Sequence, residues 1–125
     1  MKKTGRPVSP HVTIYAFPIT ALTSIANRAT GMCLSFGCLG LGVMEMAGGS
    51  GSALSFVETL GQSSFLIAAP AKFCVAFPLT YHYLGGVRHM LWDRNPDMLT
   101  NEDTEKASYA LLASSTVLSG IMMFV

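Results

Sequence analysis

Long stretches without a charged side chain are the feature that most constrains this chain. Residues 29–44 and 107–125 contain no Asp, Glu, Lys or Arg, and residues 65–92 contain only Lys72 and Arg88. A helix of about 20 apolar residues matches the thickness of the hydrocarbon core of a bilayer. The sequence therefore predicts an all-α membrane protein with three transmembrane helices, over about residues 25–47, 65–92 and 105–125.

The overall composition agrees with a membrane environment. Of the 125 residues, 50% are hydrophobic and only 12% are charged, which is too little charge for an ordinary soluble domain. We expect an N-terminal segment over residues 1–23 and a three-helix anchor over 24–125, which leaves no room for a separate soluble catalytic domain. If the chain takes part in an enzyme, other subunits carry most of the chemistry. The formal net charge of +1 gives no basis for binding nucleic acid.

Small residues mark two further features of the expected anchor. Residues 48–64, GGSGSALSFVETLGQSS, are rich in Gly and Ser and predict a linker between the first two spans. In the third span, Ala110 with Ser114 and Ser115 with Ser119 place small side chains at helical spacing. Such spacing is typical of helices that pack closely in membranes.

The basic residues predict an orientation. Most of them precede or open the first span or flank the loop between the second and third spans: Lys2, Lys3, Arg6, Arg28, Arg88, Arg94 and Lys106. Only Lys72 belongs to the other side. Lys and Arg are enriched on the inner side of membranes. We therefore expect the N-terminus and the second loop to face the matrix or cytoplasm, and the C-terminus to face the opposite side.

Two histidines in the second span are candidates for chemistry. His82 and His89 are seven residues apart, so they lie on nearly the same helix face, about 10 Å apart along the axis. Gly85 and Gly86, one turn after His82, leave the side-chain space that a flat macrocycle would need. Imidazole is a usual axial ligand of haem iron, and ionisable groups inside membranes are functional candidates. A histidine bonded to a neighbouring helix is the alternative, and the spacing leaves both open.

Two motifs resemble the succinate dehydrogenase cytochrome b family. The segment HYLGGVRHMLWD, residues 82–93, resembles the family signature in which His is followed by Gly, an aliphatic residue, Arg-His, a hydrophobe, an aromatic residue and Asp. The segments RPVSPHVTIY, residues 6–15, and SIANRATG, residues 24–31, resemble the N-terminal signature, which ends in Ser-x-x-His-Arg-x-Ser/Thr-Gly. Both motifs stand in the family's order relative to the three expected spans.

The resemblance implies a membrane-anchor subunit of complex II, which forms half of a heterodimeric helix bundle. It implies that His82 is an axial ligand of haem b and that His89 lies near the haem. His89 lies near the membrane surface and His11 precedes the first span, so a second histidine ligand would come from a second small three-helix subunit. The other implied partners are the iron–sulfur subunit, the flavoprotein subunit and membrane lipid. The implied location is the mitochondrial inner membrane, with a bacterial inner membrane as the alternative.

A quinone site is expected where the first span begins. Ser24 and Arg28 are four residues apart, on one helix face, and both side chains can donate hydrogen bonds to a quinone oxygen. From the residues alone, Ser24 is equally well a helix N-cap and Arg28 a basic membrane anchor. The resemblance implies that both contact quinone and that Arg28 can also meet a haem propionate. Asn27 stands where the family has His, near the propionates and the quinone.

The function implied by the resemblance is electron transfer from the iron–sulfur subunit to quinone, in a complex in which this chain is not an enzyme alone. Alternatives are a quinol:fumarate reductase of the same family, a structural anchor without functional haem, and a transporter or channel subunit. The last would need several polar groups along a path, and the spans are otherwise apolar. Arg88 and Asp93 are further candidates for pairing with a docked soluble subunit.

Overall fold

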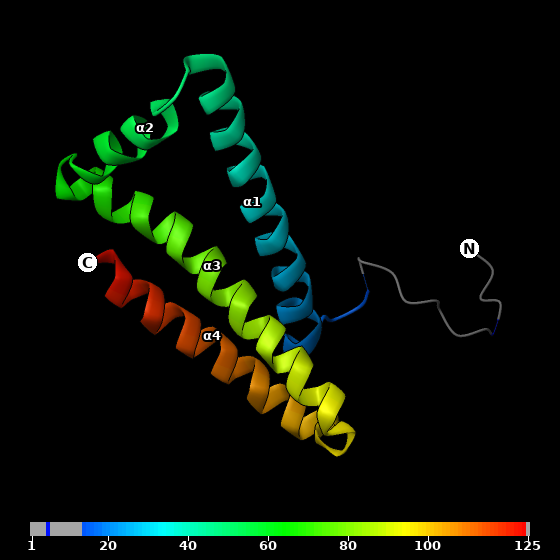
Figure 1. Cartoon of the computed structure of the whole chain (residues 1–125). Helices are drawn as coiled ribbons and strands as arrows, with labels where there is room; N and C mark the ends of the chain where they lie inside the picture. Colours follow the sequence, from blue (N-terminus) through cyan, green and yellow to red (C-terminus); the bar gives the residue numbers. More distant parts are fainter. Residues whose placement is uncertain (1–4, 6–13, 125) are drawn as a thin grey trace.

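The chain folds into helices connected by short turns. The computed structural model describes Gly5 and residues 14–124. Its elements are α1 (Ile19–Gly48), α2 (Ser52–Gly61), α3 (Phe65–Arg94), the short 3-10 helix η1 (Pro96–Met98) and α4 (Asn101–Met123) (Figure 1). No strand occurs in the part of the chain that the structure describes, which confirms the all-α prediction.

The helices meet closely at one end of the molecule and separate at the other. α3 and α4 run antiparallel side by side, and α1 contacts both where it begins (Figure 1). We call this the basic end, because it holds Arg28, Arg94 and Lys106. At the opposite end, here called the open end, α1 diverges from α3 and α2 connects them. Lys2, Lys3 and Arg6 lie outside the described residues, and the side of the membrane that each end faces stays a prediction.

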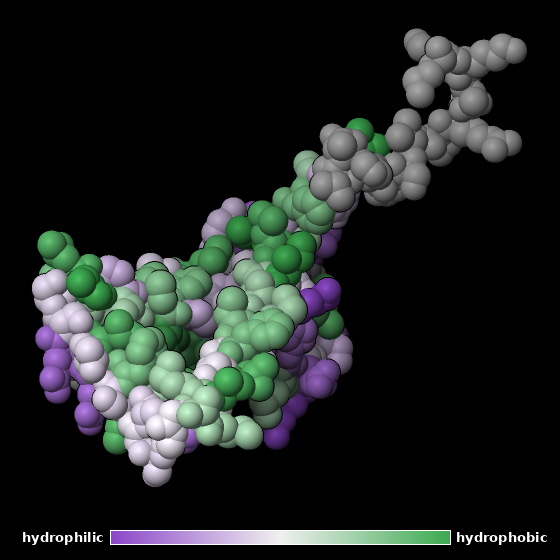
Figure 2. Space-filling view, turned by 90° about the horizontal axis from the view of Figure 1, so that it is seen from above, coloured by the Kyte–Doolittle hydropathy of each residue, from purple (hydrophilic) through white to green (hydrophobic). Residues whose placement is uncertain are grey.

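The outside of the molecule is apolar. Large hydrophobic side chains such as Phe36, Met46, Leu66 and Val117 are exposed, and hydrophobic residues cover much of the face that Figure 2 shows. Of the described helices, α1 and α3 are each long and apolar enough to cross a membrane. A soluble chain of this size would bury such side chains, so this surface suits lipid as its surroundings.

α4 is less apolar than α1 and α3 and is not among the helices apolar enough to cross a membrane, although it contains the longest uncharged stretch. Hydroxyl side chains interrupt it, and each donates to a main-chain carbonyl one turn earlier in the helix: Ser108, Ser114, Ser115, Thr116 and Ser119. The third span therefore stays a prediction. The internal hydrogen bonds make these hydroxyls compatible with lipid, because no polar atom is left without a partner.

Small residues join α3 to α4, as their spacing predicted. Ser115 and Ser119 are fully buried, and the Thr80 hydroxyl on α3 lies 2.7 Å from the hydroxyl of Ser119. The other small pair, Ala110 and Ser114, is exposed and lies outside this contact. Buried hydroxyl groups thus contribute to the α3–α4 contact, beside larger side chains such as Leu111, which is also buried.

The prediction that residues 48–64 form a linker without helical structure is wrong, because this segment contains α2. The carboxylate of Glu45 accepts hydrogen bonds from the main-chain N–H groups of Gly51, at 2.6 Å, and Ala53, at 3.0 Å. These are donors at the start of α2 that have no partner within the helix. Gly49 and Gly51 supply the positive φ angles, 85° and 88°, that the turn requires. A side chain from α1 therefore begins α2.

Candidate functional site

The imidazole of His82 is held by α1. Its Nδ1 lies 2.9 Å from the main-chain carbonyl oxygen of Asn27. A carbonyl carries no proton, so Nδ1 donates and the neutral ring keeps a lone pair on Nε2. Histidines that bind metals are usually oriented in this way, by a carbonyl or carboxylate on the other ring nitrogen. The ring is exposed on the outer side of the bundle, where a group bound to Nε2 would be accessible to a second chain.

Gly31 makes room for this ring. A Cβ atom at Gly31 would lie 2.7 Å from Cε1 of His82 and 3.1 Å from Nδ1, closer than carbon contacts allow. Gly31 is one turn after Asn27 on α1, so two neighbouring turns of this helix receive the ring. The sequence analysis quoted Gly31 within a motif but assigned it no role.

The two glycines after His82 differ in what surrounds them. We expected both to leave space for a macrocycle. A Cβ atom at Gly85 would collide with the side-chain amide of Asn27, so this space is already filled and the expectation for Gly85 is wrong. Gly86 has no neighbouring atom within 4 Å of such a Cβ. A free Nε2 on His82 and open space at Gly86 together fit a haem on this exposed face of α3.

Asn27 therefore contacts α3 through both its main chain and its side chain. Its carbonyl receives His82, its amide packs on Gly85, and its Oδ1 is buried without a hydrogen-bond partner among the described residues. The expected position of Asn27 near the haem propionates and the quinone stays a prediction. The contact with His82 gives this residue a second role, independent of which side chain it carries.

Ser24 and Arg28 lie inside α1. The helix begins at Ile19, with Pro18 preceding it, so the reading of Ser24 as an N-cap is wrong. Ser24 is half-buried and Arg28 is exposed, one turn further along the helix. The one ion pair among the described residues joins Lys106 to Glu102, so Arg28 has no carboxylate partner there. Within the described part of the chain, neither side chain forms an ion pair with another residue.

A cluster of polar residues, here called the polar junction, joins α1, α3 and α4 next to this pair. It consists of Thr23, Tyr81, Arg88, Trp92 and Ser108. Arg88 is only 8% exposed, and its Nη1 donates to Ser108 Oγ at 3.2 Å and to Thr23 Oγ1 at 3.4 Å. Its guanidinium carbon lies 4.7 Å from the centre of the Trp92 ring. Arg88 is thus buried within this chain and is not the docking residue that we considered.

Tyr81 completes the contact with α1. Its side chain is fully buried, and its hydroxyl donates to the carbonyl oxygen of Thr23 at 3.1 Å. Tyr81 and His82 are consecutive on α3, and the carbonyls they bond, those of Thr23 and Asn27, are one turn apart on α1. These two hydrogen bonds fix the register of the helices. Ser24 and Arg28 directly follow the two carbonyls in sequence, so the same register sets their level along α3.

The remaining candidates lie at the edge of this arrangement. His89 is exposed, and its ring packs edge-on against Trp92 at a centroid distance of 5.6 Å. Asp93 is exposed and forms no ion pair with another described residue. In the described part of the chain, no three His, Cys, Asp or Glu side chains gather around a possible metal site. A single imidazole, that of His82, is what the chain presents most favourably to a metal.

The sequence motifs did not predict the polar junction. A signal for it was present, because Thr23, Tyr81 and Arg88 each precede a residue that the motifs had singled out. Polar side chains at membrane depth need partners, and partners on different helices have to lie at the same depth. The sequence could not predict that Ser108 belongs to the junction. Its partner on α3 depends on how far α4 is shifted along α3.

The helices have apolar outer faces, and buried hydroxyl and guanidinium groups join them. One oriented imidazole is presented to the outside. These features define a helical membrane subunit suited to holding a metal-containing group. The family described as succinate dehydrogenase/fumarate reductase transmembrane subunit matches residues 2–122. The chain belongs to this family and is an integral membrane protein.

Similar proteins come from mitochondria and bacteria. The mitochondrial succinate dehydrogenase cytochrome b560 subunit of Dictyostelium discoideum is 44% identical over 126 residues, which cover 100% of this chain and 65% of the relative. The Bos taurus protein of the same name is 39% identical, covering 94% of this chain and 69% of the relative. The succinate dehydrogenase cytochrome b556 subunit of Paracoccus denitrificans is 33% identical, covering 97% and 92%. This chain thus spans about two thirds of the mitochondrial relatives' length.

Proposed function

We propose that this chain is a membrane-anchor subunit of a succinate:quinone oxidoreductase in the mitochondrial inner membrane. In this role it shares a b-type haem and a quinone site with a second anchor subunit and passes electrons from an iron–sulfur subunit to quinone. The relatives named as cytochrome b subunits support this assignment. The observation that carries it is the hydrogen bond from His82 Nδ1 to the Asn27 carbonyl, which leaves Nε2 free to bind iron.

Four residues would hold the haem. His82 provides the iron ligand, the Asn27 carbonyl fixes its tautomer, Gly86 leaves space beside the ring, and Arg28 supplies a positive charge for a propionate. When bound, the haem supplies one-electron chemistry, with a potential set partly by its axial ligands. The chain's own task is to orient the imidazole before the haem arrives, which lowers the entropy cost of binding.

A second anchor subunit would complete the iron coordination. The His82 ring is exposed, so a second chain could reach a group that its Nε2 would hold. The exposed hydrophobic side chains next to it need a further apolar surface or lipid to cover them. A second three-helix subunit with its own histidine would meet both needs. The iron–sulfur and flavoprotein subunits would then dock at the basic end.

The quinone site would use Ser24 and Arg28. A quinone oxygen gains negative charge on reduction, so a hydroxyl and a guanidinium that donate to it bind the reduced form more tightly than the oxidised form. Both residues lie in the part of α1 that Tyr81 and His82 fix against α3. Donors held rigidly act without reorganisation during the reaction. Ser24 and Arg28 would thus position the head group and stabilise its charge.

The assignment of His82 is tested by its alanine variant in the assembled complex. His82→Ala removes the iron ligand, and we expect the reduced-minus-oxidised spectrum to lose the low-spin b-type signal or to change to a high-spin form. His89→Ala is the matched control, because it removes an exposed imidazole from the same face and should leave the signal. An unchanged low-spin spectrum in the His82 variant, with assembly verified, would refute the ligand assignment.

A further inference from the structure

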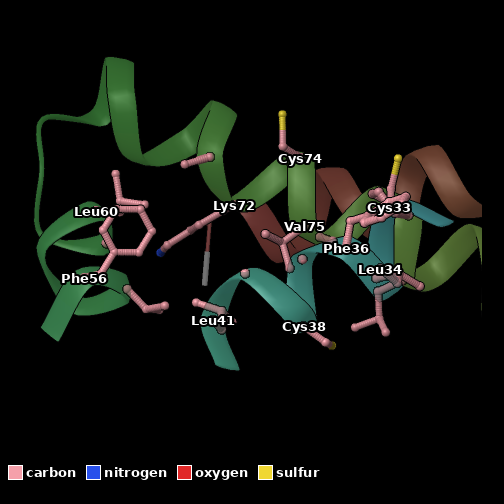
Figure 3. A pocket seen from close by; sticks show the side chains of 18 of the residues that line it. Cys33, Leu34, Phe36, Cys38, Leu41, Phe56, Leu60, Lys72, Cys74 and Val75 are labelled. Atoms are coloured by element: carbon pink, nitrogen blue, oxygen red, sulfur yellow. The ribbon is translucent and has the colours of Figure 1, made fainter. Parts of the chain in front are cut away.

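A second site lies at the open end, separate from the residues around His82. A cavity of about 780 Å³ opens between α1, α2 and α3 (Figure 3). None of its lining residues belongs to the candidate haem and quinone site or to the polar junction. Its volume is within the range of about 300–1,000 Å³ that is usual for ligand pockets. The cavity is therefore large enough for a small molecule or for part of a lipid.

The walls of this cavity are apolar except at one position. Phe36 and Leu41 of α1, Phe56 and Leu60 of α2, and Val75 of α3 are among the residues that line it, and Lys72 is the only charged one. Figure 3 shows the Lys72 side chain reaching from α3 into the space that these residues border. A ligand that matches this lining has a long apolar part and one negative charge.

None of the residues that the structure describes supplies a counter-charge to Lys72. Among the described residues, the single ion pair is between Lys106 and Glu102. The carboxylate of Glu45, on α1, accepts hydrogen bonds from the N–H groups that begin α2. Arg88 shows how the same chain treats a buried cation, with two hydroxyl acceptors and an aromatic ring around it. A cation at membrane depth without such partners is costly, so an external anion is the missing element.

We propose that this cavity binds an anionic phospholipid, with an acyl chain along the apolar walls and the phosphate at the Lys72 ammonium group. Anionic phospholipids are amphiphiles of this kind that surround membrane-spanning helices, and basic side chains near the membrane surface attract them. A partner helix, about 10 Å across, fits less well, because α2 limits the space between α1 and α3. This inference does not depend on the roles of His82, Ser24 or Arg28.

The charge is tested with the assembled complex, delipidated in a neutral detergent and titrated with phosphatidylglycerol or phosphatidylcholine while bound lipid is counted by native mass spectrometry. We expect phosphatidylglycerol to bind preferentially, and Lys72→Met to weaken that binding about five-fold, the effect of one basic residue. Lys72→Arg should retain it. Lys106→Met is the control, because it removes an exposed lysine from the other end. Equal binding of the two lipids, or unchanged binding in Lys72→Met, would overturn the proposal.

The cavity itself is tested by filling it. Gly40 lines the cavity and has no atom within 4 Å of an added Cβ, so Gly40→Leu places an apolar side chain in the space without a collision at that atom. Gly42 is equally open but does not line the cavity, so Gly42→Leu is the matched control. We expect only Gly40→Leu to reduce phosphatidylglycerol binding. A photoreactive group at Val75 should capture lipid, and capture of a polypeptide would identify a partner helix and contradict the proposal.

Discussion

The two ends of the molecule treat a positive charge in opposite ways. At the basic end, Arg88 is buried among hydroxyl groups and an aromatic ring that all belong to this chain. At the open end, Lys72 projects into an apolar cavity and the chain offers it no carboxylate among the described residues. The first arrangement holds three helices together, and the second leaves them apart. A cation at membrane depth can thus serve as an internal connection or as a point of attachment for something outside the chain.

The largest effect is expected from removing the partners of Arg88. Thr23→Val together with Ser108→Ala deletes both hydroxyl acceptors and leaves a buried guanidinium without them. An uncompensated buried charge typically costs about 3–5 kcal/mol, so we expect failure to accumulate or a strongly lowered thermal transition of the complex. The control is Ser114→Ala, which deletes an exposed hydroxyl from the same helix. Normal assembly and stability of the double variant would mean that the basic end does not depend on this junction.

The quinone donors should affect activity rather than assembly. Ser24→Ala and Arg28→Ala each remove donors to an oxygen that becomes negative, which we expect to raise the barrier by about 1.5–3 kcal/mol and to slow succinate-to-quinone electron transfer roughly ten- to a hundred-fold. Electron transfer from succinate to a dye that accepts electrons from the soluble subunits should be unchanged. Arg28→Ala should have the larger effect, because a charge is lost too. Normal quinone reduction with normal inhibitor sensitivity would return these residues to a merely structural role.

A methyl group added to glycines of α1 distinguishes the two ends further. Gly31→Ala places a Cβ against the His82 ring and should displace it, at a cost of about 1–3 kcal/mol, with a changed haem spectrum or reduced haem content. Gly37→Ala adds the same methyl group toward the open end, where no atom lies within 4 Å, and should leave the spectrum unaltered. Identical spectra for both variants would show that α1 does not hold the ring as closely as described.

The smallest effect on stability is expected at Lys72. No described residue pairs with the ammonium group of Lys72. Lys72→Met should therefore change the free energy of unfolding of the fully delipidated complex by no more than about 0.5 kcal/mol, measured by thermal unfolding. With phosphatidylglycerol present, the unaltered complex should become more stable than the variant. A large loss of stability without lipid would mean that a partner subunit supplies the counter-charge, and the contrast between Arg88 and Lys72 would then not hold.

The predictions from sequence succeeded where local pattern determines the outcome. The all-helical class followed from uncharged runs, since their length and composition are properties of each segment alone. The contact of Ser115 and Ser119 with α3 followed from spacing, but the exposure of Ala110 and Ser114 did not, because the rotation of α4 selects which small pair faces inward. A helix face can be identified from sequence more readily than the neighbour it meets.

Three of the failures share one physical cause, a contact between separate segments. α2 was predicted as a linker because its flanks are rich in Gly and Ser, and the Glu45 carboxylate that begins it lies on the preceding helix. Gly85 was expected to be empty, but the Asn27 side chain reaches it from α1. Arg88 was considered as a docking residue, but it is buried against Ser108, which lies on another helix. In each case the deciding atom lies outside the segment that carried the prediction.

The paired hydrogen bonds of Tyr81 and His82 have a mechanical consequence. They join two successive carbonyls along one side of α1, those of Thr23 and Asn27, to two successive residues of α3. A rotation or slide of α1 would therefore change the direction of the imidazole and the positions of Ser24 and Arg28 together. A molecule that displaces α1 at the quinone donors would also tilt the His82 ring. If Ser24 and Arg28 bind quinone and His82 binds haem, occupancy of one site would be communicated to the other over a single helical turn of α1.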